Sequence, residues 1–236
     1  PSGLVRLTLA STLQRLPVQF RGDLAKALAF RSEDKNDHNL PLVVWAGIAP
    51  LVELDPEKLM DVARNTEWSN LRTWIARAIT ERSKENPVAF NTLLELLGDQ
   101  PDQADSLLAG IERAVLGIKG FEQPAKWSEI SSKLQGNPNA LKLSVLFGSE
   151  DAIGQMEKLI MNRDAGTEVR KQTMTILIDS NSPNLKSISE RLLQESEMNI
   201  LGARGLSKFV DNRTGEMLVS SLQAFDGEER DEVVEI

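Results

Sequence analysis

The sequence predicts an all-α fold, a right-handed α-solenoid of about seven helix pairs. Three observations favour it. Two amphipathic helices, each followed by a short break, recur about every 30 to 35 residues; apolar residues follow a helical period; and no comparable stretch alternates as a strand would. The first helices of the pairs are expected to begin near Leu4, His38, Asn70, Gln103, Pro138, Glu168, Asn199 and Glu228.

The third pair shows the helical period most clearly. Leu71, Ile75 and Ile79 are spaced four residues apart, and Trp74 and Ala78 fall beside them on the same face of a helix. The following helix repeats this spacing at Phe90, Leu93, Leu94 and Leu97. Two facing apolar stripes of this kind can pack together and form one helix pair.

Cap residues and glycines mark the breaks. At four junctions a residue with a side-chain acceptor precedes a proline. The acceptor can satisfy a free N–H group of the first turn, and proline has no N–H group to leave unpaired. The junctions are Asp55-Pro56, Asn86-Pro87, Asn137-Pro138 and Ser182-Pro183. Glycines, which adopt positive φ readily, occur at or near other breaks: Gly98, Gly136, Gly148, Gly166 and Gly215. Ordinary turns in an irregular all-α domain are the alternative interpretation. Gly202 and Gly205 predict a tight contact between helices.

We expect residues 1–236 to form a single array, because each repeat packs mainly on its neighbours. We also expect the chain to be a piece of a larger protein. Residues 228–236 start another helix, and no later helix follows to cover Val233, Val234 and Ile236. The longest apolar run, residues 40–54, is too short and too interrupted by prolines to insert into a membrane.

The formal net charge of −8 disfavours nucleic acid as a partner, because phosphate binding depends on clustered cations. The richest basic stretch, residues 64–84, is interrupted by Glu67 and Glu81 and is interpreted as a solvated helix face. With no cysteine and one histidine, we expect no metal and no cofactor in this chain. No residue pattern indicates a catalytic site, so the chain is predicted not to be an enzyme.

Five residues are candidates for a structural or partner-contact motif: Asp37, His38, Asn39, Trp45 and Arg72. The first three lie where one helix pair gives way to the next, and we interpret them as holding that junction together. Unpaired polar groups at such a junction would cost about 1 to 3 kcal/mol each. The tryptophans of the chain are interpreted mainly as core residues between helices.

Residues 37–42, followed by Trp45, Gly47 and Pro50, resemble a segment of large bacterial multidomain haem-binding proteins of the membrane-bound dehydrogenase type. In that family a β-propeller comes first, HEAT-like helical repeats follow, and a c-type cytochrome domain comes last. The resemblance is best over residues 1–85, while residues 86–236 resemble helical repeats in general.

The resemblance implies a spacer between a catalytic domain and an electron-carrying domain, exported to the periplasm or another extracytoplasmic compartment. The family's haem-binding motif needs cysteines, which this chain lacks, so haem binding is not carried over. Two classes of function are retained. The first is a non-catalytic scaffold that binds flanking domains or another protein, and the alternative is a helical-repeat enzyme fragment with a substrate in its concave groove. The sequence leaves the oligomeric state open.

Overall fold

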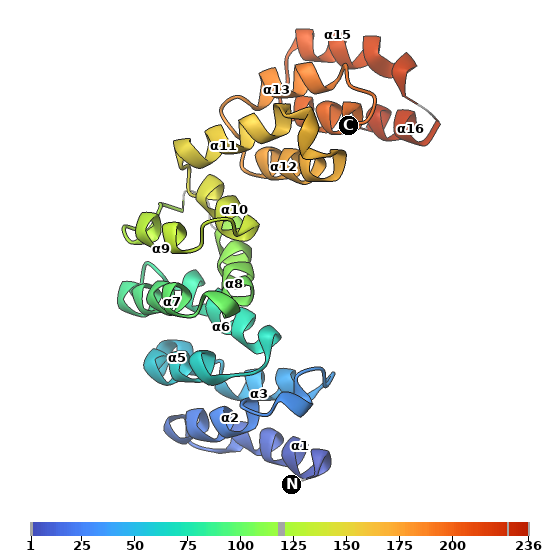
Figure 1. Ribbon diagram of the computed structural model, residues 1–236. Helices are drawn as coiled ribbons and strands as arrows, with labels where there is room; N and C mark the ends of the chain where they lie inside the picture. Colours follow the sequence, from blue (N-terminus) through green and yellow to red (C-terminus); the bar gives the residue numbers. More distant parts are fainter. Residues whose placement is uncertain (1, 118–120, 226, 236) are drawn as a thin grey trace. The chain divides into compact units, whose positions relative to one another are not determined.

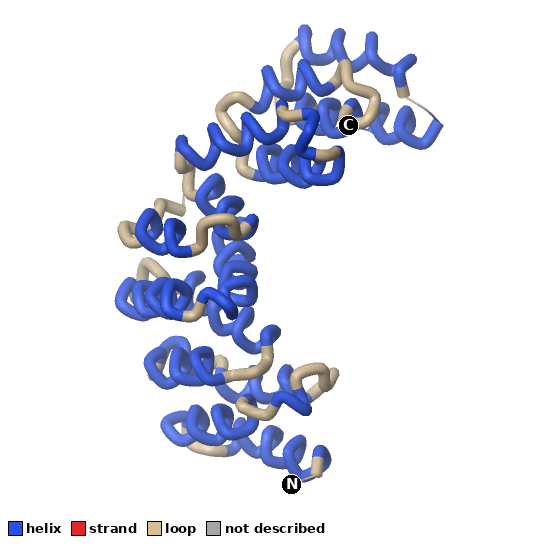
Figure 2. Tube along the Cα trace, in the orientation of Figure 1, coloured by secondary structure: helices blue, strands red, loops and turns tan. Residues whose placement is uncertain are grey.

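The structure is a computed structural model that describes residues 2–117, 121–225 and 227–235. Within these ranges all regular secondary structure is helical, and short loops join the helices (Figure 1 and Figure 2). The all-α prediction is therefore confirmed. The chain divides into two compact units, residues 1–143 and residues 144–236.

Two series of helices contact one another in succession in residues 1–143. The α-helices are α1 (Gly3–Thr12), α2 (Arg21–Ala29), α3 (Leu40–Ile48), α4 (Leu51–Leu54), α5 (Pro56–Asn65), α6 (Ser69–Glu81), α7 (Pro87–Asp99), α8 (Ala104–Gly117) and α9 (Trp127–Lys133). The first series is α1, α3, α6 and α8, and the second series is α2, α5, α7 and α9 (Figure 1). Four 3₁₀ turns lie between them: η1 (Leu13–Arg15), η2 (Val18–Phe20), η3 (Ser32–Asp34) and η4 (Pro101–Gln103).

The second unit is centred on α14. Its boundary with the first falls within α10 (Pro138–Leu146), and its other α-helices are α11 (Glu150–Met161), α12 (Thr167–Asp179), α13 (Leu185–Leu192), α14 (Asn199–Leu206), α15 (Asn212–Ser221) and α16 (Gly227–Glu235), with η5 (Arg163–Ala165) and η6 (Leu222–Ala224). Helices α12, α14 and α16 contact in succession, α11 packs on α12, and α13 and α15 pack on α14.

Helix starts agree with the sequence pattern. Each predicted first helix corresponds to an observed one, α1, α3, α6, α8, α10, α12, α14 or α16, and begins within two residues of the expected position. Three of the four cap junctions are confirmed, because Asp55, Asn86 and Asn137 accept N–H bonds from residues three positions later, at 3.0 to 3.1 Å.

The fourth junction was predicted wrongly. Helix α13 begins at Leu185, with Asn184 as its N-cap, and Pro183 lies in the turn before it. The hydroxyl of Ser182 donates to Glu157 of α11 at 3.3 Å, so this side chain joins α11 to the turn before α13 instead of capping a helix. Asn181, just before, takes a positive φ of 48° that the sequence analysis did not anticipate.

Three of the five glycines near breaks have the positive φ that such positions often need. Positive φ values of 79° to 87° confirm Gly136, Gly148 and Gly166 as turn residues. Gly98 is the next-to-last residue of α7 and Gly215 the fourth residue of α15, so both lie near breaks, but neither has a positive φ.

The predicted apolar stripes form the core. Leu71, Ile75 and Ile79 of α6 are at most 1% exposed, and the four stripe residues of α7 are also buried. Trp68 and Trp127 are fully buried, as expected of core residues. Val233 departs from expectation: it is buried against α14 in a cluster with Phe225, whereas Val234 is exposed and Ile236 lies outside the described residues.

The glycines of α14 confirm the predicted tight contact. A Cβ on Gly202 would meet the backbone N of Leu193 at 2.7 Å, and one on Gly205 would meet Ser189 Oγ at 2.2 Å. Helix α14 therefore packs directly against the backbone of α13 and its C-terminal cap. Only glycine permits this approach.

Candidate functional site

The segment of Asp37, His38 and Asn39 lies on the surface just before α3. Asp37 Oδ1 accepts the backbone N–H groups of Asn39 and Leu40, at 2.8 and 2.7 Å. These bonds favour the charged carboxylate and lower the pKa of Asp37. Asp37 therefore holds the start of α3 by satisfying N–H groups that the helix leaves free.

His38 and Asn39 have a less defined role. Both side chains are exposed, and His38 forms no hydrogen bond within the described part of the chain. Asn39 contributes its backbone, since its carbonyl accepts the N–H of Val43 at 2.9 Å. The expected junction role is thus supported for Asp37, and the exposure of His38 gives it no support there.

Trp45 contacts a tryptophan of the next first-series helix. Its ring on α3 lies 6.4 Å, centroid to centroid, from the ring of Trp74 on α6, with the planes tilted by 41°. Both residues are half-buried, in contrast to the fully buried Trp68 and Trp127. Leu42, one turn before Trp45 on α3, is 55% exposed. An accessible aromatic and apolar surface therefore spans two successive helix pairs; we call Leu42, Trp45 and Trp74 the tryptophan surface.

Arg72 is buried, with 5% of its surface exposed, so it is a structural residue and not a partner contact. Its Nε donates to the carbonyl of Ala63 at 3.2 Å, its Nη2 donates to the carbonyl of Thr66, and its Nη1 donates to Ser106 Oγ at 3.2 Å. Desolvation lowers the pKa of Arg72. The guanidinium joins the end of α5 to α8.

Two arginines that the sequence analysis missed have the same position as Arg72. Arg6, Arg72 and Arg170 are each the fourth residue of a helix, in α1, α6 and α12. Arg6 Nη2 donates to Asp34 at 2.7 Å, and Arg170 donates to the carbonyl of Ile160 and to Glu195, both at 2.7 Å. Each reaches forward toward the next helix pair. In the sequence, the only sign of this role is that each arginine is the fourth residue of its helix.

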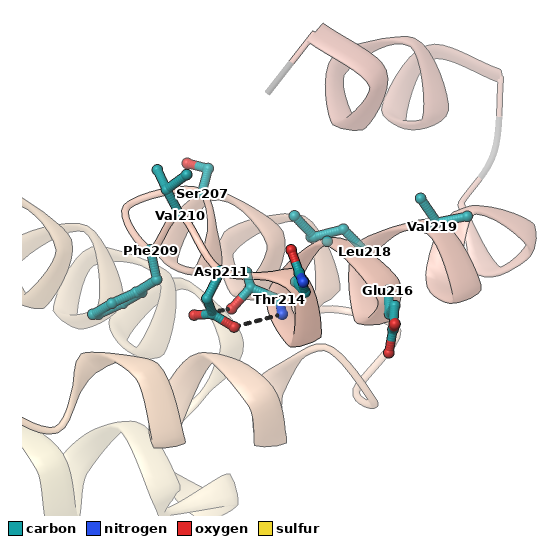
Figure 3. A pocket seen from close by; sticks show the side chains of 10 residues that line it. Ser207, Phe209, Val210, Asp211, Thr214, Glu216, Leu218 and Val219 are labelled. Carbon is teal, nitrogen blue, oxygen red and sulfur yellow. Dashed lines mark hydrogen bonds between the residues drawn. The ribbon is translucent and has the colours of Figure 1, made fainter.

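A shallow depression in residues 144–236 lies beside the start of α15 (Figure 3). One of its two carboxylates, Asp211, accepts from Lys186 Nζ at 2.7 Å and from the N–H and hydroxyl of Thr214, each at 3.0 Å. The bond from Lys186 is the largest of the causes that lower the pKa of Asp211 to about 2. The charge of Asp211 is therefore paired within the chain. Val210 and Val219, at the edge of the depression, are exposed apolar side chains.

The described side chains include no group of three or more His, Cys, Asp or Glu residues placed to hold a metal ion. None of the helices in the described ranges has the length and apolar character that crossing a bilayer requires. Comparison with known proteins returned no match to any protein family, curated protein or solved structure.

Proposed function

We propose that this chain is a non-catalytic helical-repeat scaffold that binds a protein partner, either a flanking domain of the same protein or a separate protein. The tryptophan surface is the observation that carries the proposal. Aromatic residues contribute much of the energy of protein interfaces when they lie partly exposed at the surface. Here two of them, Trp45 and Trp74, belong to successive helix pairs, so one partner can contact both pairs.

The architecture we propose is an α-solenoid of HEAT-like helix pairs. Successive contacts within the first and second series support it for residues 1–143, and the succession of α12, α14 and α16 supports it for residues 144–236. Right-handedness and a single array over residues 1–236 stay predictions. Repeat arrays of this type present extended surfaces for partners, which is consistent with a binding role.

The resemblance in residues 1–85 supports a more specific proposal. In it, the chain is the spacer of a haem-binding, dehydrogenase-like protein outside the cytoplasm and holds a catalytic domain apart from an electron-carrying domain. The scaffold itself would need no cofactor. A protein partner also suits the tryptophan surface better than nucleic acid, because the nearby Arg77 is already paired with Glu81 at 2.7 Å.

Site-specific photo-cross-linking tests the proposal. Benzoylphenylalanine replaces Leu42 on the tryptophan surface or, as a control, Val88 on α7, which is 72% exposed and belongs to the second series. In the cells that make the protein, position 42 should form one discrete cross-linked protein product and position 88 should not. Combining the probe at 42 with Trp45→Leu should weaken the product. Equal products from both positions, or none from position 42, would reject the tryptophan surface as a partner site.

A further inference from the structure

A groove in residues 144–236 lies between two helices, α11 and α13. Its lining residues are Gly154, Glu157, Lys158, Met161, Asn184, Ser187, Ile188 and Arg191. Ile188 is 5% exposed and forms an apolar floor with the half-buried Met161. A Cβ on Gly154 would meet no atom within 4 Å, so the α11 side of the groove is open.

The groove has two cations without an ion-pair partner. Residues 144–236 contain 10 basic and 17 acidic residues, and 10 − 17 gives a formal net charge of −7. Despite this acidic excess, Lys158 and Arg191 form no ion pair with any residue that the structure describes, and both are exposed. Six of the ten cations in this unit do form such pairs.

The one carboxylate in the groove is already occupied. Glu157 accepts from the amide of Asn184 at 2.9 and 3.1 Å and from the hydroxyl of Ser182 at 3.3 Å. These bonds connect α11 to the turn before α13. Glu157 is thus committed to a structural contact, and the positive charges of Lys158 and Arg191 remain available.

At comparable contacts between helices elsewhere in the chain, the cation forms an ion pair with a carboxylate. Lys26 of α2 pairs with Asp61 of α5, and Lys126 before α9 pairs with Glu95 of α7. Between α13 and α15, Lys186 pairs with Asp211 at 2.7 Å. In each case a carboxylate from the neighbouring helix, or from its cap, meets the cation. The groove between α11 and α13 has cations of this kind without such a carboxylate.

We infer that this groove binds an acidic segment of a partner protein, one that carries two carboxylates next to an apolar side chain. The carboxylates would pair with Lys158 and Arg191, and the apolar side chain would lie on Ile188 and Met161. The inference rests on the proposed function, since it assigns a partner chemistry to a scaffold. It concerns residues 144–236, whereas the tryptophan surface belongs to residues 1–143.

A labelled peptide tests the inference on the intact chain. The probe is fluorescein-labelled Gly-Ser-Glu-Leu-Glu-Leu-Glu-Ser-Gly, and its control has glutamine at each glutamate. Fluorescence anisotropy should show binding of the acidic peptide that weakens with added salt, and about tenfold weaker binding of the glutamine peptide. Absence of binding by the acidic peptide, or equal binding of both peptides, would overturn the inference.

Charge-reversal variants locate the binding. The double variant Lys158→Glu with Arg191→Glu should weaken binding of the acidic peptide at least about tenfold, with an unchanged circular dichroism spectrum. Each single reversal, Lys158→Glu or Arg191→Glu, is also compared with Lys208→Glu, which makes the same change of charge at another exposed cation of this unit without an ion pair among the described residues. Equal loss with this control would show a general charge effect and reject the groove.

Two further measurements separate a protein ligand from a nucleic acid, and a failure of the groove proposal from a failure of the scaffold proposal. A ten-nucleotide oligothymidylate that binds as tightly as the peptide, with the same sensitivity to Lys158→Glu, would reject a protein partner for the groove. Photo-cross-linking from position 42 is repeated in the double variant, because Leu42 belongs to residues 1–143 and the two substituted cations belong to residues 144–236. A failed peptide experiment with intact cross-linking therefore rejects the groove and leaves the proposed scaffold function standing.

Discussion

Replacing Gly202 with alanine should destabilise residues 144–236, although alanine is the better helix former. The added Cβ would lie 2.7 Å from the backbone N of Leu193 and 2.9 Å from the carbonyl O of Ser189. Ordinary contact begins near 3.4 Å, so α14 must move away by roughly 0.7 Å. Both contacting atoms belong to backbone, which cannot yield as a flexible side chain would.

The expected size follows from two opposing terms. Overpacking of a well-packed contact costs about 1–3 kcal/mol, while replacing glycine by alanine inside a helix contributes about 1 kcal/mol of stability. The difference is a net loss of about 1 kcal/mol, rising to about 2 kcal/mol as the separation loosens the buried contacts of Ala203 and Leu206. For a unit of this size, each kcal/mol lowers the melting temperature by roughly 4–8 °C.

Gly215→Ala is the matched control in the same unit. Gly215 lies inside α15, and a Cβ there would meet nothing within 4 Å, so this variant should gain about 0.5–1 kcal/mol. The assay is urea unfolding followed by circular dichroism, with tryptophan fluorescence in parallel. All four tryptophans lie in residues 1–143, so fluorescence reports on the first unit and circular dichroism on both. A Gly202→Ala protein as stable as the Gly215→Ala control would refute the close packing of α13 and α14.

Three other substitutions test the polar contacts. Arg72→Met should cost about 2–4 kcal/mol in the transition seen by fluorescence, because it leaves the carbonyls of Ala63 and Thr66 without this donor; a change below about 0.5 kcal/mol would contradict the bonds described. Asp37→Ala should lower the melting temperature and His38→Ala should leave it almost unchanged, and the reverse order of melting temperatures would restore the junction role to His38. The folded pKa of Asp211, about 2, lies below its ordinary value of 3.8, so its contribution to stability is present above pH 4 and is lost as the pH falls toward 2. Lys186→Gln should reduce that acid sensitivity, because the bond from Lys186 is the largest cause of the lowered pKa, and an unchanged acid unfolding curve would count against the Lys186 contact.

Helix content and helix starts could be predicted from the sequence because their signals are local. A cap such as Asn86 and the proline after it act on the first turn of their own helix, and the stripe of α6 depends only on a period of 3.6 residues. Ser182 shows where this reasoning fails. Its hydroxyl had a distant carboxylate, Glu157, as a competing partner, and no local pattern shows which helix will lie nearby.

The candidate site was harder to predict because exposure depends on neighbouring helices. Trp45 and Trp68 are the same residue type in adjacent pairs, yet Trp68 is fully buried and Trp45 is not. The pairing of Trp45 with Trp74 also depends on the contact of α3 with α6. The cations Lys158 and Arg191 are separated by 33 positions, and only the packing of α11 near α13 places them in one groove.

The arginines at the fourth position of α1, α6 and α12 show how polar side chains join successive helix pairs. The position of Arg6, Arg72 and Arg170 is constant, whereas their forward partners differ: a carboxylate of Asp34, the hydroxyl of Ser106 and a carboxylate of Glu195. A long side chain with five donors can find an acceptor in each of these settings. The acceptor that each turn or helix supplies therefore differs from one pair to the next. Asp37 and its neighbours form one such turn, whereas the half-exposed tryptophans and the cations of the groove have no comparable role in holding the pairs together.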